Sequence, residues 1–211
     1  MTGRSRTEPA GAAPGYDDTV GWVRIDGLIA PDEAGRLAAA CLACADGLAD
    51  PRAGDKPHGA TRRLTGLEER VPATAAVAEA IGPVVDQSLG PRWTITEIGF
   101  RWPGPGSGGQ QLHADDRPRT DPDLPCAGAT AIVPLVDVTP DNGATRVVPG
   151  SHRRPDLQRR SQQIDHHPDE EYLTGPAGTG FVFSRHLLHA GSTNRSDRPR
   201  PVLQISYRAG P

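Results

Sequence analysis

Three side chains carry the strongest chemical signal in this sequence. His113 and Asp115 are separated by one residue, and a second histidine, His189, follows much later. Two imidazoles and one carboxylate can hold one face of an octahedral iron(II) ion and leave the other three positions open. Arg200 lies a short strand beyond His189, where its guanidinium could grip the carboxylate of an organic acid bidentately. The pattern predicts a mononuclear metal centre beside an anion site.

The elements that must position these residues change character along the chain. Helical patterns dominate the first part, and Gly82-Pro83 should bend or split the second helix. From residue 93 onward, apolar residues alternate with a period of two, which is typical of strands. The expected helices are 31–47 and 72–89, and the expected strands are 22–25, 93–102, 127–138, 146–148, 180–184 and 201–208.

Helices followed by short strands favour an antiparallel jelly-roll barrel, that is a double-stranded β-helix, with helices packed on one side. The 25 glycines and 22 prolines fit this fold, because most fall after residue 90 and separate short apolar segments. On a strand, residues 113 and 115 share a face. His189 follows Asp115 by 74 positions, so only the fold can bring it to them.

The length of 211 residues indicates one well-filled domain over residues 19–211. Residues 1–18 are polar and rich in small residues, so we expect a mobile N-terminal tail. Residues 51–66 read as a basic loop. Residues 152–175 are polar and mixed in charge, and they read as an exposed insert or lid.

Composition excludes several classes of function. The formal net charge of −3, without a basic stripe, argues against nucleic acid as a partner. The apolar runs are too short to span a bilayer, and the N-terminus lacks the layout of a signal peptide. Three cysteines suit a reducing compartment, so we expect a cytoplasmic protein. Cys41 and Cys44 lie in an alanine-rich helical stretch, which favours small core residues over a zinc site.

Three segments together carry a resemblance: Gln111–Asp115, Asp141–His152 and His189–Arg200. In this order they resemble the phytanoyl-CoA dioxygenase family of iron(II)/2-oxoglutarate oxygenases. Asp26–Ile29, before the first helix, is similar to the opening segment of that family. The similarity covers about residues 20 to 208, nearly the whole chain.

The resemblance implies that His113, Asp115 and His189 are the catalytic iron ligands. It implies that Arg200, 11 residues after the distal histidine, binds the C5 carboxylate of 2-oxoglutarate, with Ser196 as a further contact. Such enzymes use O2 to oxidise a small molecule and release succinate and CO2. Because related halogenases replace the carboxylate ligand with a small residue, Asp115 favours hydroxylation or another oxidation, such as desaturation, epoxidation or ring formation.

The chain also departs from the family pattern. Ala114 stands between the ligands where relatives often carry a larger or polar residue, and Gly191 stands where some relatives have serine. The chain is compact for the family, which limits any substrate cap. Its high Ala, Gly, Pro and Arg content is typical of GC-rich bacteria, where such enzymes often act in specialised metabolism.

Three of the assigned residues have a rival nearby in the sequence. Asp116 competes with Asp115, His186 with His189, and Arg198 with Arg200. His152 has a packing role as its simplest interpretation. His58, Arg62 and Arg63 have either a place at the cavity mouth or a surface role. His166 and His167 could form a second metal site, but a solvated charged loop is the favoured interpretation. Two other functions stay open: a non-catalytic jelly-roll protein that binds a metal or ligand, and a cupin-like enzyme that uses another divalent metal without 2-oxoglutarate.

Overall fold

The structure is a computed structural model that describes residues 13–46, 63–121 and 124–210. Residues 1–12 of the expected tail lie outside the described residues, as do His58 and Arg62. The rest of that tail packs on the domain: the Tyr16 amide donates to the Gln87 side chain (2.8 Å), and its ring contacts the core. Within the described residues, no helix is both long and apolar enough to cross a bilayer.

The N-terminal part contains the two expected helical regions. The second is divided as the sequence predicts, because Pro83 lies in the first turn of a new helix, where its missing amide hydrogen costs nothing. One short strand follows the first helix. The elements are β1 (Trp22–Ile25), α1 (Pro31–Asp46), β2 (Arg63–Thr65), α2 (Ala73–Ala80) and α3 (Gly82–Leu89).

The C-terminal part is built from strands and two short helical turns. Its strands are β3 (Trp93–Arg101), β4 (Gly128–Pro134), β5 (Thr145–Val147), β6 (Glu171–Leu173), β7 (Gly180–Ser184), β8 (His189–Gly191) and β9 (Val202–Ala209). Between β5 and β6 lie a 3-10 turn, Ser151–Arg153, and the short helix α4, Pro155–Gln158.

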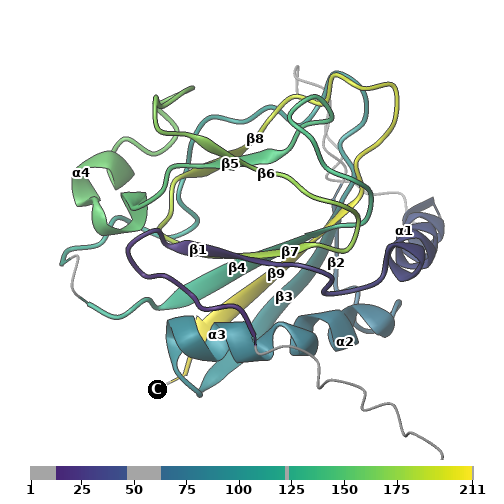
Figure 1. Ribbon diagram of the computed structural model, residues 1–211, viewed down its shortest axis with the longest axis horizontal. Coiled ribbons are helices and arrows are strands. Elements are labelled where there is room, and N and C mark those ends of the chain that lie inside the picture. Colours follow the sequence, from purple (N-terminus) through teal and green to yellow (C-terminus); the bar gives the residue numbers. More distant parts are fainter. Residues whose placement is uncertain (1–12, 47–62, 122–123, 211) are drawn as a thin grey trace, which may run out of the picture.

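Two antiparallel sheets face each other and form the expected double-stranded β-helix. The larger sheet has the order β1-β7-β4-β9-β3-β2, and the smaller has the order β6-β5-β8. In Figure 1 the small sheet lies above the large one, while α2 and α3 run along the outer face of the large sheet. This layering leaves the space between the sheets for a site.

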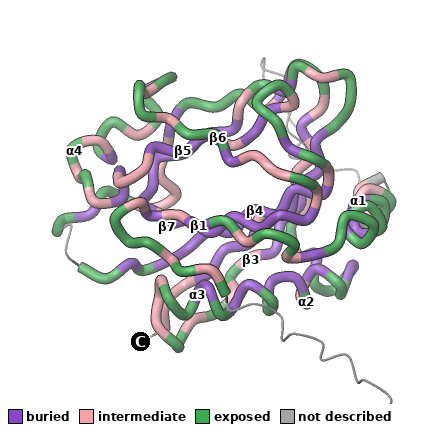
Figure 2. Tube along the Cα trace, viewed as in Figure 1, coloured by how far each residue is buried: buried purple, intermediate pink, exposed green. Residues whose placement is uncertain are grey.

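Alternation along the strands separates two cores. In β4, Ala131 and Val133 pack toward the helices, whereas Ile132 faces the other sheet. Leu203 and Ile205 of β9 share the helix side. Figure 2 shows the resulting burial, which is continuous along β4 and β7. Because side chains alternate with a period of two, the intervening residues of these strands point between the sheets.

The structure differs from the sequence-based expectation in its shortest elements. Residues 63–65 of the expected loop form β2, and β6 and β8 were not expected. Residues 152–175 are partly built into the domain, since Gln158 is fully buried and donates to two backbone carbonyls (2.9 and 2.7 Å). A polar composition does not reveal this burial, because the backbone satisfies the polar groups.

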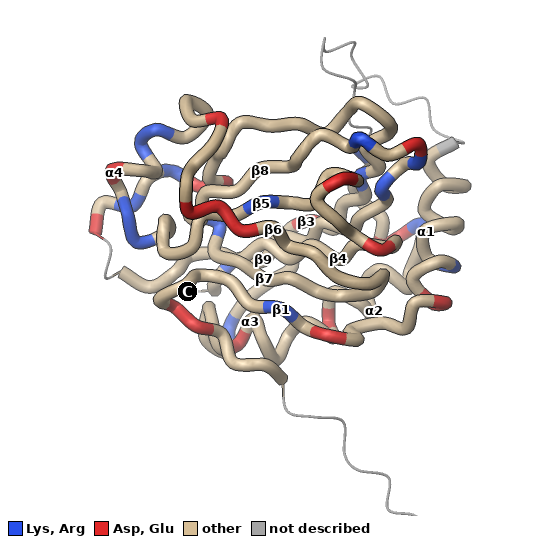
Figure 3. The backbone as a smooth tube through the Cα atoms, turned by 45° about the horizontal axis from the view of Figure 1, so that its top comes forward, with Lys and Arg blue, Asp and Glu red and all other residues tan. Residues whose placement is uncertain are grey.

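Charged residues of both signs are spread over the described chain (Figure 3). An acidic segment at β6 lies directly beside the arginine of β5. There Arg146 and Glu170 form an ion pair of 2.8 Å with both side chains less than a tenth exposed. This buried pair connects β5 with the residue that directly precedes β6, the neighbouring strand of the small sheet.

Candidate metal centre

His113, Asp115 and His189 meet between the two sheets. Each offers one ligand atom, and these three atoms lie within 4.8 Å of one another. The two histidines are joined through the backbone, because each amide donates to the carbonyl of the other (2.9 Å both ways). This isolated bridge brings two stretches together that are far apart in the sequence. Among the described residues, this is the one group of its kind.

Each histidine is oriented by a backbone carbonyl two residues earlier. His113 Nδ1 lies 3.0 Å from the Gln111 carbonyl oxygen, and His189 Nδ1 lies 3.0 Å from that of Leu187. A carbonyl oxygen only accepts hydrogen bonds, so Nδ1 carries the proton in both rings. Nε2 of each ring is therefore left with the lone pair that binds a metal.

Burial keeps His189 in the neutral form that a metal requires. Desolvation lowers the pKa of His189 to about 4, although the carboxylate of Asp115 opposes the shift. Its ring packs against those of Phe183 and His113, with centroid distances of 4.8 and 4.4 Å. The ring is thus fixed in position and unprotonated near neutral pH.

Asp115 supplies the negative charge of the group. Burial would raise its pKa, but His189, the Thr130 hydroxyl and Arg185 together hold the pKa below its usual value. One carboxylate oxygen, Oδ1, lies 3.8 Å from His189 Nε2. The other, Oδ2, accepts a hydrogen bond of 2.7 Å from Thr130. The carboxylate is ionised and faces the two imidazoles. Together the donors suit one divalent cation.

A cavity opens from this group and contains two arginines. Its wall consists of Arg101, Pro103, Gly108, Gln110, His113, Asp115, Ile132, Thr145, Phe183, His189, Gly191, Arg200, Val202 and Gln204. Arg200 is 5% exposed, and its Nε has no hydrogen-bond partner among the described residues. Burial lowers the pKa of Arg200 to about 10, with a further contribution from Arg101, so the side chain stays charged at neutral pH. Arg200 was expected here.

Arg101 was not singled out from the sequence. Its Nε is also buried without a partner, and burial followed by the charge of Arg63 lowers its pKa. The sequence did contain an indication, because Arg101 lies on the polar side of the alternating strand β3. In the structure it is in register with Val202. The cavity therefore presents two cationic side chains, neither of which has an ion pair among the described residues.

A polar groove continues from the cavity toward solvent. Gln110 and Gly191 line both spaces, and the groove has a volume of about 970 Å³. Its wall includes Gln111, Arg146, Asp165, His166, Tyr172, Ser192, Thr193 and Arg195. A groove of this size can admit a small molecule to the metal group.

The rim between cavity and groove is made of closely packed backbone. A Cβ atom on Gly191 would lie 2.6 Å from the Gly108 carbonyl oxygen and 3.0 Å from Gln110 Oε1. Gln110 and Gly191 also exchange hydrogen bonds, both of 3.0 Å. The Gly108 carbonyl and the Gln110 carboxamide thus occupy the space that a side chain at position 191 would need.

The rival residues lie elsewhere. Asp116 pairs with Arg208 (2.7 Å) and Arg185 (3.1 Å). His186 is buried and belongs neither to the metal group nor to the cavity wall. His152 is held by the Asp18 carbonyl oxygen (2.8 Å) and packs against Gly21.

Ser196 does not line the cavity. Its hydroxyl donates to Asn194 Oδ1 (2.7 Å) and shapes the loop before β9, so the structure gives it a local role. Arg198 is exposed, while Arg200 is buried in the cavity. His166 side-chain atoms are 78% exposed and contact Arg146 and Glu170.

Fold and site together define a jelly-roll protein with a two-histidine, one-carboxylate candidate metal centre. The chain belongs to the phytanoyl-CoA dioxygenase (PhyH) family, whose sequence profile matches residues 18–202. The family resemblance seen in the sequence is confirmed.

Relatives and solved structures agree with this assignment. The L-proline trans-4-hydroxylase of Streptomyces griseoviridis is 30% identical, over 65% of this chain and 60% of that protein. The carbocyclase SnoK from nogalamycin biosynthesis superposes with a TM-score of 0.74 at 18% identity, covering 90% of this chain and 81% of SnoK. EctD from S. alaskensis superposes with a TM-score of 0.68 at 24% identity, covering 96% of this chain and 79% of EctD. The chain thus spans about 60% of the length of the L-proline trans-4-hydroxylase.

Proposed function

We propose that this chain is an iron(II)- and 2-oxoglutarate-dependent oxygenase that oxidises a small molecule. One observation carries the proposal: the three candidate metal ligands and the buried Arg200 line the same cavity. Bound iron(II) would supply the activation of O2 that couples oxidative decarboxylation of 2-oxoglutarate, to succinate and CO2, with oxidation of the substrate.

The residues of the chain would bind and orient the reactants. His113, Asp115 and His189 would hold the metal on one face and leave the opposite positions to the cosubstrate and O2. Arg200 would bind the C5 carboxylate of 2-oxoglutarate, because a guanidinium matches a carboxylate in a bidentate way. Phe183 and Ile132 add apolar surface to the cavity wall and help exclude water.

The charges of the cavity support a dianionic cosubstrate. Arg101 and Arg200 each lack an ion pair among the described residues, and a buried unpaired charge is costly unless a ligand compensates it. 2-Oxoglutarate carries two carboxylates. SnoK is an alpha-ketoglutarate-dependent enzyme, and the EctD structure contains 2-oxoglutarate, which supports the same cosubstrate here.

We propose that the substrate is a small molecule that enters through the polar groove, and that hydroxylation is the usual outcome. A role in bacterial specialised metabolism fits the origin of SnoK in nogalamycin biosynthesis and the Streptomyces hydroxylase among the relatives. All three cysteines are free thiols, which fits a reducing compartment such as the cytoplasm.

The test is formation of succinate from 2-oxoglutarate by the full chain with iron(II), ascorbate and O2, measured by mass spectrometry. We expect slow succinate release without substrate, and none above background from His189→Ala. Arg198→Gln, which changes an exposed arginine, is the control and should keep the wild-type rate.

Two results would contradict the proposal. A folded, metal-loaded chain that neither forms succinate nor binds 2-oxoglutarate would indicate a jelly-roll binding protein. Activity that depends on a divalent metal but not on 2-oxoglutarate would indicate a cupin-like enzyme of another class.

A further inference from the structure

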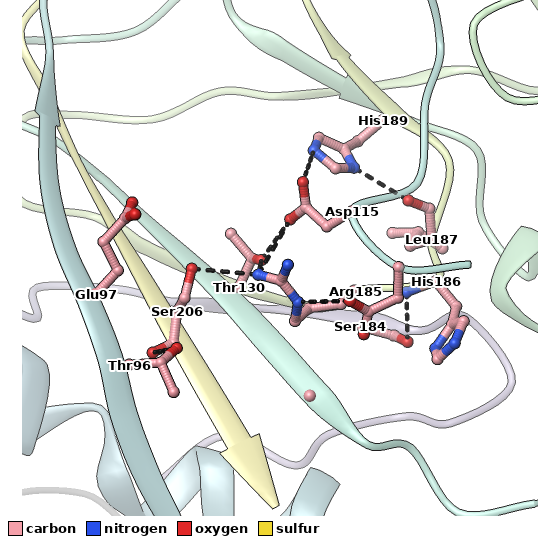
Figure 4. A network of polar contacts seen from close by, with 12 residues as sticks. Thr96, Glu97, Asp115, Thr130, Ser184, Arg185, His186, Leu187, His189 and Ser206 are labelled. Atoms are coloured by element: carbon pink, nitrogen blue, oxygen red, sulfur yellow. Dashed lines mark hydrogen bonds and ion pairs between the residues drawn. The ribbon is translucent and has the colours of Figure 1, made fainter. Parts of the chain in front are cut away.

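We propose that Thr130 and Arg185 form a clamp that holds Asp115 as a one-oxygen metal ligand and so keeps a third coordination position open. The inference rests on the metal centre of the proposed function. Figure 4 shows the contacts: Thr130 and Arg185 approach the carboxylate of Asp115 on the side away from His189.

Thr130 provides the direct contact. It lies in β4 on the face between the sheets and is fully buried. Its hydroxyl donates to Asp115 Oδ2 at 2.7 Å. A short hydrogen bond to a charged acceptor is among the stronger ones in proteins, and burial strengthens it further. Thr130 therefore fixes the rotation of the carboxylate.

Arg185 fastens both the carboxylate and its backbone. Its carbonyl oxygen accepts hydrogen bonds from the amides of Asp115 (2.9 Å) and Asp116 (3.1 Å). Its Nη1 lies 3.7 Å from Asp115 Oδ2, while its Nε binds Asp116 Oδ1 at 3.1 Å. Because Arg185 precedes His189 by four residues, one residue links the two distant parts of the metal group.

Neighbouring groups hold the guanidinium of Arg185 in place. Ser206 Oγ accepts a hydrogen bond of 3.2 Å from Nη1. Gly128 lets the side chain pass, since a Cβ there would lie 2.6 Å from Arg185 Cδ. Asp116, which binds Arg185, also pairs with Arg208. Its negative charge is therefore balanced by two arginines. These contacts keep Arg185 at its distance from Asp115 and leave Asp115 available to a cation.

The two oxygens of Asp115 consequently have different roles. Oδ2 is occupied by Thr130 and faces Arg185, whereas Oδ1 faces His189 Nε2 at 3.8 Å. Binding through Oδ1 alone leaves three positions at a six-coordinate metal, and binding through both oxygens would leave two. 2-Oxoglutarate needs two positions and O2 needs one, so the clamp matches the requirement of the reaction.

The test compares Thr130→Val, which removes the hydroxyl at nearly constant volume, with Thr130→Ser, which retains it. Cobalt(II) is the probe in the absence of O2, with affinity measured by calorimetry and coordination by visible absorption. We expect Thr130→Val to lose about 10- to 100-fold in affinity, the usual effect of losing such a supporting contact, and to show a changed cobalt spectrum. Thr130→Ser should resemble wild type.

Thr96→Val is the matched control. Thr96 lies in the same sheet, and its hydroxyl bonds the Ser206 carbonyl (3.2 Å) instead of Asp115 (Figure 4). It should change neither the affinity nor the spectrum. Arg185→Gln is a second variant, and we expect it to weaken cobalt binding. Its thermal midpoint is measured in parallel to check that the variant is folded.

The outcomes separate the clamp from the proposed function. Wild-type affinity and spectrum in Thr130→Val would overturn the clamp while the metal centre stands. If the wild-type chain itself binds no cobalt, and His189→Ala behaves identically, both the metal centre and the clamp are overturned.

Discussion

At the residue scale, Arg200 is a buried cation that has no ion pair among the residues that the structure describes. It lines the cavity with its Nε unpaired, and Arg101 nearby carries the same charge. A folded protein tolerates such an arrangement when a ligand provides the compensating charge. The pair of arginines supports the proposal that 2-oxoglutarate binds here and supplies the compensating charge.

We expect Arg200→Gln to weaken the binding of 2-oxoglutarate by about 10- to 100-fold, because a hydrogen bond to a charged group contributes about 1.5–3 kcal/mol. Calorimetry with the manganese-loaded chain under nitrogen measures this directly. Arg198→Gln should bind like wild type. Equal affinities for the two variants would remove Arg200 from the cosubstrate site.

Sequence reasoning singled out the residues of the candidate site that carry a local pattern or a family resemblance. His113 and Asp115 are adjacent on one face of an extended segment, and the resemblance identified His189 and Arg200. Arg101 escaped because an arginine on the polar side of a strand usually faces solvent. Only the second sheet converts that side into a cavity wall. The carbonyl partners of the histidines, Gln111 and Leu187, are backbone groups and leave no trace in residue type.

At the element scale, the small sheet is held by more than its backbone. Its strands β5, β6 and β8 have three residues each, which is too short for much stability on their own. Arg146 of β5 donates to both carboxylate oxygens of Glu170, at 2.8 Å each, next to β6. This ion pair closes the side of the sheet that borders the groove.

We expect Glu170→Gln to destabilise the protein by about 3 kcal/mol, because it leaves the buried Arg146 charge uncompensated. For a chain of this size the thermal midpoint should fall by about 6–12 °C. Asp156→Asn, which breaks an exposed pair with Arg154, should leave the midpoint unchanged. A midpoint within 1–2 °C (approximately the error of such scans) for both variants would contradict the assigned role.

The ion pair of Arg146 and Glu170 also determines how the stability of the protein changes in acid. Burial would raise the pKa of Glu170, but hydrogen bonds from Arg146 and from the His167 amide hold it below its usual value. A depressed pKa means that the stabilisation is complete above the pKa of the unfolded chain. This stabilisation is lost as the pH falls through the lower pKa that Glu170 has in the folded protein. Glu170→Gln should therefore flatten the loss of stability in acid.

The same short strands mark the limit of sequence reasoning about elements. Long patterns such as β3 and the break between α2 and α3 were predicted, since several residues repeat the period. β2, β6 and β8 show too few repeats for a period of two to be recognised. Their extended form comes from pairing with neighbours, which is a tertiary effect.

At the scale of the whole molecule, the metal centre joins segments that are 74 positions apart. Pairing of His113 with His189 depends on both sheets being in place. A cation that binds this group favours the folded state over the unfolded chain, in which the ligands are dispersed. Metal binding and folding should accordingly be linked.

We expect manganese(II) at about 100 times its dissociation constant to stabilise the metal-free chain by about 2.7 kcal/mol, or about 5–10 °C in thermal midpoint. Differential scanning fluorimetry with and without a chelator measures the shift. His189→Ala should show no shift, whereas His167→Ala, a histidine outside the group, should keep it. An equal shift in both variants would place the ion elsewhere.

Gly108 and Gly191 pack main chain against main chain at the rim of the cavity, and no side chain separates them. The width of the opening between the cavity and the groove is consequently set here by the main chain. Substituting other side chains of the wall would change the chemistry of the passage and leave this main-chain contact in place. A single methyl group at position 191 would push the two segments apart, so Gly191→Ala would alter the spacing of the main chain between the cavity and the groove.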